Sequence, residues 1–321
     1  MHSRTVRETS YSRDHADVIA WLLEGDISIR FQAYRDLLDE HEPALQKRIA
    51  KEGWGLRLLD AQHPGAYWGR GFYMPKWSSS HYTLLDLRNL CISPDCRAAK
   101  SSIAGILEKH KASDGGINPN TGIQVSDVCI NGMFLNYASY FRADEQLLQS
   151  VVDFILNQVM PDGGFNCRSN RGGAVHSSLH TTLSVLEGIH EYRTNHYTYR
   201  LDELTEAETS SREFILQHQL FLSDRTGKVI HPDFLRLRYP FRWHYNLLRA
   251  LDYFRNSLTP YDTRMDKAIS YLIGKRRPDG TWKLASGYPG EVHVVMEKAG
   301  KPSRWVTLLA MRILKHYKIR A

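Results

Sequence analysis

Three residues in the middle of this chain have side chains that commonly bind zinc. Asp127 and Cys129 are two positions apart, and His180 lies further along the chain. Zinc is held by carboxylate oxygen, thiolate sulfur and imidazole nitrogen, and three protein ligands leave a fourth position for water or substrate. The sequence therefore predicts an open zinc site formed by Asp127, Cys129 and His180, with Zn²⁺ as the cofactor. The alternative is a buried cysteine and a hydrogen-bonded core histidine without a metal.

Two further histidines are candidate catalytic residues. An imidazole changes its charge near neutral pH, so it can take a proton from a zinc-bound water. His244 is predicted either to act as that base or to complete the metal shell, and a structural role is an equal alternative. His81 is predicted to line the cavity as a polar residue, where it could take part in catalysis.

These residues fall at matching places in a series of similar segments. Each segment has apolar residues at i, i+3, i+4 and i+7, which is the periodicity of an α-helix. Successive segments are roughly 50 residues apart, which leaves room for two helices and a loop. The segments are residues 27–38, 80–90, 128–141, 179–192, 243–254 and 304–314. Their first turns carry Arg30, His81, Cys129, His180, His244 and Trp305.

Glycine-rich turns precede most of these segments, and further helical stretches such as residues 147–160 and 265–276 lie between them. No alternating strand pattern of useful length is present. The pattern predicts an all-α protein, an (α/α)6 toroid, with an open helical solenoid as the alternative. Residues 1–15 are predicted to form an N-terminal arm, and residues 16–321 a single toroid domain.

The turns QVMPDGGFNC and KRRPDGTWKL resemble the repeat of squalene and hopene cyclases, which the β subunits of protein prenyltransferases share more loosely. Those β subunits hold zinc with an aspartate, a cysteine two residues later and a histidine on a later inner helix. SDVCINGMF and HTTLSVLEGI resemble these two elements. The resemblance thus implies the toroid fold and the same ligands, Asp127, Cys129 and His180.

The chain departs from both families at the residues that perform their chemistry. Prenyltransferases place basic residues three and six positions before the zinc aspartate, where this chain has Gln124 and Thr121. The acidic D-x-D-D cluster with which cyclases protonate their substrate is missing from the sequence. Prenyl transfer from a diphosphate and acid-initiated cyclisation are therefore not supported.

The composition narrows the class of protein. The formal charge of +7 suits an anionic partner, but Lys and Arg are scattered, so no nucleic-acid partner is predicted. No apolar run is long enough to span a membrane, and the first residues lack the apolar stretch of a signal peptide, so a cytoplasmic location is expected.

Together these features predict a zinc-dependent enzyme that acts on a small-molecule or thiol-bearing substrate in the central cavity. The reaction would be group transfer to a thiol or the chemistry of a metal-activated water. One alternative is a non-catalytic toroid that binds an apolar isoprenoid ligand or a protein partner. The other is a diverged terpene cyclase or prenyltransferase.

Overall fold

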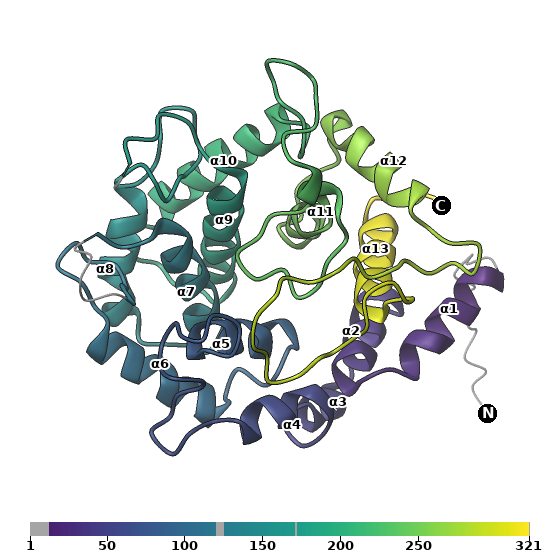
Figure 1. Cartoon of the computed structure of the whole chain (residues 1–321), viewed down its shortest axis with the longest axis horizontal. Helices are drawn as coiled ribbons and strands as arrows, with labels where there is room; N and C mark the ends of the chain where they lie inside the picture. The colour runs from purple at the N-terminus through teal and green to yellow at the C-terminus, as the bar shows by residue number, and fades with distance from the viewer. Residues whose placement is uncertain (1–12, 120–124, 171, 321) are drawn as a thin grey trace, which may run out of the picture.

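The computed structural model describes residues 13–119, 125–170 and 172–320. Within these residues the chain is helical, with isolated bridges and no strand. Figure 1 looks down the axis of a ring in which inner and outer helices alternate along the sequence. The predicted N-terminal arm falls almost entirely on residues 1–12, outside the described part.

The described inner helices surround the centre of the ring, and they correspond to the predicted segments. They are α2 (Ile27–Leu37), α5 (Ser80–Asn89), α7 (Val128–Tyr140), α9 (Leu179–Thr194), α11 (Leu247–Asn256) and α13 (Arg304–His316). Outside them lie α1 (Arg13–Leu23), α3 (Pro43–Arg48), α4 (Gly53–Asp60), α6 (Arg97–Lys109), α8 (Glu145–Leu156), α10 (Leu201–Gln217) and α12 (Asp266–Gly274). Two short 3₁₀ helices, η1 (Pro232–Leu235) and η2 (Thr263–Met265), lie in the connections.

The ring is closed by contacts between its first and last helices. Arg312 of α13 donates to Gln32 of α2 at 3.0 Å, and Arg304 donates to the carbonyl oxygen of Trp21 on α1 at 2.9 Å. An open solenoid would leave these ends apart. The (α/α)6 toroid is therefore confirmed, and the solenoid alternative is excluded.

The glycine turns serve the same purpose in successive repeats. The backbone N–H after each turn donates to a side chain at the start of the next inner helix. The pairs are Trp68 with Ser80, Ile117 with Asn131, Phe165 with Thr182 and Trp282 with Thr307, at 2.7–3.0 Å. Because these donors are buried, the bonds keep them satisfied and orient each inner helix.

The closest helix packing in the ring is between α7 and α9. A Cβ atom on Gly132 would lie 2.7 Å from the Ser184 carbonyl oxygen, and one on Gly188 would lie 2.4 Å from the Gly132 carbonyl oxygen. Only glycine permits this separation, so the backbones touch at this crossing.

A long connection between α12 and α13 covers one mouth of the ring. We call residues 284–303 the crossing loop; Figure 1 shows it passing in front of the centre. Its first half is bound to the segment just before α5, where Trp77 Nε1 donates to the Pro289 carbonyl oxygen at 2.7 Å and His293 Nε2 lies 2.7 Å from the Ser78 carbonyl oxygen. The loop therefore lies over the mouth at which α5 begins.

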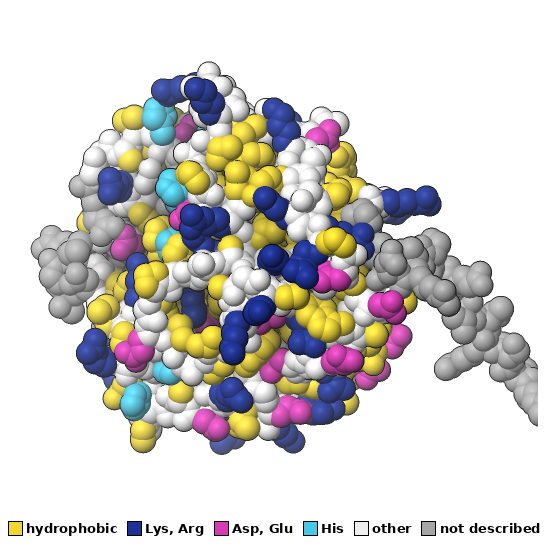
Figure 2. Space-filling model, turned by 45° about the vertical axis from the view of Figure 1, so that its right-hand side comes forward, with side chains coloured by type: hydrophobic (Ala, Val, Ile, Leu, Met, Phe, Trp, Pro, Cys, Tyr) yellow, Lys and Arg dark blue, Asp and Glu magenta, His cyan; other side chains and the backbone are white. Residues whose placement is uncertain are grey.

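None of the described helices combines the length and apolar character needed to cross a membrane. On the face in Figure 2, Lys and Arg side chains are interspersed with Asp and Glu.

Candidate ligand-binding cavity

The centre of the ring contains a cavity of about 290 Å³ to which every inner helix contributes. Its wall is formed largely by the second halves of the inner helices, so it lies beyond their first turns. The charged and aromatic residues that line it include Arg35, Asp36, Arg88, Glu187, His190, Glu191, Tyr239, Arg242, Arg249, Asp252, Arg255, Trp305 and Arg312.

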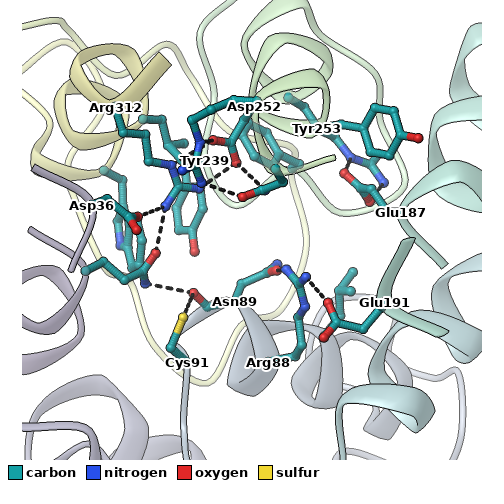
Figure 3. Close-up of a pocket in the computed structure, with 18 of the residues that line it drawn as sticks. Asp36, Arg88, Asn89, Cys91, Glu187, Glu191, Tyr239, Asp252, Tyr253 and Arg312 are labelled. Atoms are coloured by element: carbon teal, nitrogen blue, oxygen red, sulfur yellow. Dashed lines mark hydrogen bonds and ion pairs between the residues drawn. The ribbon is translucent and has the colours of Figure 1, made fainter. Parts of the chain in front are cut away.

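Three arginines of the wall are each paired with a carboxylate. Arg249 is almost fully buried and binds Glu187 with two bonds, at 2.9 Å and 2.6 Å. Arg88 pairs with Glu191, as Figure 3 shows. Arg242 pairs with Asp86, just behind the cavity wall. Each pair joins different elements of the ring, so the wall is braced by charge-assisted bonds.

A fourth group has more cations than anions. Arg312 binds Asp252 at 2.7 Å and 2.5 Å and Asp36 at 2.8 Å, and it lies between them in Figure 3. Arg35 also contacts Asp36 at 2.7 Å, and Arg255 contacts Asp252 at 3.3 Å. Three guanidinium groups thus share two carboxylates, and one positive charge in this group is not balanced.

The pKa shifts follow from this arrangement. Burial raises the pKa of both Asp36 and Asp252, but Arg312 and a second arginine outweigh it and bring each pKa below its ordinary value. Burial, together with repulsion from Arg312, lowers the pKa of Arg255. An anionic ligand beside Arg255 would relieve that repulsion.

Two uncharged groups of the wall could exchange protons with a ligand. Burial raises the pKa of Tyr239 well above its ordinary value, so its hydroxyl stays protonated. Figure 3 shows this hydroxyl pointing into the cavity, and among the described residues no hydrogen bond to it is found. Burial lowers the pKa of His190 to about 4, so its imidazole is neutral near pH 7.

The histidines predicted from the sequence lie at the other end of the inner helices. His81 is fully buried, its Nδ1 lies 3.1 Å from the Tyr137 hydroxyl, and burial lowers its pKa to about 3. His244 is stacked between Trp243 and Tyr288, with ring centroids 3.8 Å and 3.4 Å away, and burial lowers its pKa to about 3. Neither lines the 290 Å³ cavity.

His180 lies near His244, with ring centroids 6.0 Å apart, as the matching positions predict. Its Nδ1 accepts the Tyr245 N–H at 2.8 Å, and burial lowers its pKa to about 4. The His180 imidazole borders a second, open cleft of about 790 Å³, which is also lined by His176, His218 and His231.

The structure does not gather the predicted zinc ligands. Asp127 is the N-cap of α7, as expected, while Cys129 lies against Cys167. Among the residues the structure describes, no group of three or more His, Cys, Asp or Glu side chains is spaced to hold a metal ion. Zinc binding by Asp127, Cys129 and His180 therefore stays a prediction of the sequence.

The cavity residues were missed because they lie later in the same inner helices. A signal was present: Arg88, Glu187, Arg249, Asp252 and Arg312 are charged residues inside strongly apolar segments. A charge on a helix that is buried on all sides needs a partner or a ligand.

Comparison with solved structures supports the fold through a polysaccharide lyase. The polysaccharide lyase BACCELL_00875 is similar with a TM-score of 0.54 and 13% identity, over 96% of this chain and 98% of that chain. The type II terpene cyclase MstE from Scytonema gives a TM-score of 0.37 at 15% identity, over 84% of this chain and 96% of that chain. No protein family and no curated protein matches the sequence. The chain is therefore an α/α toroid, the fold to which the sequence pattern and the closed ring both point.

Proposed function

We propose that this chain is a lyase that acts on an acidic saccharide bound in the central cavity. The observation that carries the proposal is the unequal charge count, in which Arg35, Arg255 and Arg312 share only Asp36 and Asp252. A carboxylate is the simplest partner for the unbalanced guanidinium group, because its two oxygens match the two donors on one edge of the group.

The rest of the wall suits a sugar. It contains both guanidinium donors and carboxylate acceptors, and sugar hydroxyls both donate and accept hydrogen bonds. Tyr239 and Trp305 stack with ring centroids 4.3 Å apart beside the cavity, and such rings can pack against the apolar face of a sugar. The toroid with the higher TM-score bears the name of a polysaccharide lyase, in agreement with this choice.

The same wall disfavours the isoprenoid ligand considered from the sequence. A hydrocarbon in this cavity would remove water from six arginines and their carboxylates without offering them a hydrogen bond. That cost weighs against both an apolar binding module and a diverged terpene cyclase.

The proposed reaction is β-elimination beside the sugar carboxylate. The base takes the proton from the carbon next to the carboxylate, the C–H electron pair forms a C=C bond, and the C–O bond to the next sugar breaks. The leaving oxygen then receives a proton. In this scheme Arg255 and Arg312 neutralise the carboxylate, neutral His190 acts as the base and the Tyr239 hydroxyl acts as the acid.

The test is a substrate panel with matched variants. The purified chain is incubated with polygalacturonate, alginate and hyaluronan, with dextran as the neutral control, and the unsaturated product is followed by its ultraviolet absorbance. We expect turnover of at least one uronate polymer, and a loss of roughly 10²–10⁴-fold in kcat for Tyr239→Phe. Tyr67→Phe, at a residue 40% exposed and outside the cavity, should keep full activity.

Two results would count against the proposal. Failure to bind or cleave any uronate polymer would overturn it entirely. Binding without product would remove the lyase reaction and support the alternative of a non-catalytic binding module, now for an acidic ligand.

A further inference from the structure

Two cysteines that are distant in sequence meet outside the cavity. Cys129 lies in the first turn of α7, and Cys167 lies in the loop that leads to α9. The Cys129 N–H donates to the Cys167 sulfur at 3.1 Å, so the two cysteines are direct neighbours in the fold. Both residues are half-buried and neither is in a disulfide, so both thiols are partly accessible to solvent.

The sulfur of Cys167 is held in this position from a second side. The Thr181 hydroxyl on α9 lies 3.5 Å from it and also accepts the Cys167 backbone N–H at 3.3 Å. The Cys167 sulfur is therefore held against the first turn of α7 by groups of α7 and α9, the two helices whose backbones touch at Gly132 and Gly188.

We propose that Cys129 and Cys167 form a disulfide when the protein meets a hydroperoxide. The Cys167 thiolate attacks one peroxide oxygen, the O–O bond breaks, and hydroxide leaves as the sulfur becomes a sulfenic acid. The Cys129 thiolate then attacks that sulfur and releases a second hydroxide, so that two protons from the thiols yield two waters from hydrogen peroxide. The cysteines lose two electrons, and the peroxide gains them.

The other cysteines provide a comparison inside the same chain. Cys91 and Cys96 are close in sequence, but the Cys91 sulfur lies 3.5 Å from Arg35 and 4.0 Å from the Asn89 carbonyl oxygen. Among the described residues no contact joins the sulfurs of Cys91 and Cys96. Sequence proximity alone therefore selects the wrong pair, and the fold selects Cys129 with Cys167.

The product would change the covalent structure of the ring. It would tie the loop before α9 to the first turn of α7. The inference does not depend on the proposed lyase reaction, because neither cysteine lines the central cavity.

The test uses the full chain, reduced and treated with a chelator so that no bound metal protects a thiol. A small excess of hydrogen peroxide is added. The intact mass of the protein is then measured, and linked peptides are identified by peptide mapping. We expect the loss of two hydrogen atoms and one linked peptide pair that contains Cys129 and Cys167, both reversed by dithiothreitol. Cys91→Ser should behave like the wild type.

Cys129→Ser keeps the attacking sulfur and removes its partner. We expect this variant to form no linked peptide and to accumulate a dimedone-trapped sulfenic acid at Cys167. A linked pair that involves Cys91 or Cys96 would overturn the proposal, as would peroxide-treated wild type in which both cysteines still react fully with iodoacetamide. Unchanged circular dichroism of each variant separates these results from misfolding.

Discussion

Arg312 and Asp252 face each other inside the ring and form two hydrogen bonds, at 2.7 Å and 2.5 Å. Arg312 comes from α13, the last inner helix, and Asp252 from α11, the inner helix before it. Both side chains are at most one-tenth exposed. Because the same guanidinium group also binds Asp36 of the first inner helix, one residue joins three helices at the seam where the ring closes. The seam is therefore also part of the wall of the central cavity.

Loss of this residue should weaken the fold. Arg312→Met would leave Asp36 and Asp252 buried with only their weaker partners, and we expect a loss of about 3 kcal/mol in the free energy of unfolding. Urea unfolding followed by circular dichroism measures this. Lys267→Met, at an exposed position of α12, should stay within about 0.5 kcal/mol of the wild type. Equal stability of both variants would show that the seam does not depend on Arg312.

Removal of the Arg255 charge should weaken uronate binding, whereas removal of Arg312 weakens the fold. Arg255→Gln removes one of three cations and keeps both ion pairs of Arg312. We expect uronate affinity to fall by roughly 10–100-fold, since a charge-assisted hydrogen bond contributes about 1.5–3 kcal/mol, while the unfolding free energy changes little. Titration calorimetry at two salt concentrations checks this, and an affinity equal to that of the wild type would remove Arg255 from the site.

Stability should fall in moderately acidic solution because of His81. Its pKa is lowered to about 3 in the folded state, whereas the unfolded chain takes up a proton near pH 6.5. The unfolded state then binds more protons between these values, so stability is highest above about pH 6.5 and declines as pH falls toward 3.

We expect His81 to account for roughly 3–5 kcal/mol of that decline, at about 1.4 kcal/mol per pKa unit. His81→Gln should flatten the curve of unfolding free energy against pH between 6.5 and 4, measured by urea unfolding at each pH. His63→Gln, at an exposed residue, should reproduce the wild-type curve. Parallel curves for wild type and His81→Gln would contradict the assignment.

Replacement of glycine by alanine should have opposite effects on stability inside and outside the contact between α7 and α9. Gly188→Ala would place a Cβ atom 2.4 Å from a backbone oxygen, and we expect a loss of about 2–3 kcal/mol. Gly105→Ala, in α6 with open space around it, should stabilise by up to about 1 kcal/mol, because alanine is the better helix former. Thermal and urea unfolding of both variants measure the difference; a neutral Gly188→Ala would show that the helices can separate.

The zinc site predicted from the sequence has a direct test of its own. The prediction is one zinc per chain by elemental analysis, lost in both Cys129→Ala and His180→Ala, with the loss of Asp127 acting in the same direction. A zinc-free wild type, or zinc retained in both variants, would remove this prediction. The result is independent of the central cavity, which contains none of these residues.

The architecture could be read from the sequence because its signals are local. Apolar periodicity identified the inner helices, and five of the six segments begin where the structure begins a helix, for example at Ile27 and Val128. The helix expected from Trp243 begins only at Leu247, because Asn246 is its N-cap. Before it, Trp243 stacks on one face of His244, and Tyr288 of the crossing loop stacks on the other. That contact joins positions far apart in the chain, so no local pattern announces it.

The position of the site depended on tertiary structure. The sequence alone determines an (α/α)6 ring and predicts that His180 lies near His244. Both follow from helix register and repeat length, which are properties of short segments. Only the folded ring decided which end holds the cavity, which charges pair and which cysteines meet. Trp77 with Pro289, Arg312 with Asp36, and Cys129 with Cys167 are all brought together by ring closure or by helix packing. The free energy of such contacts depends on partners that a local sequence window does not contain.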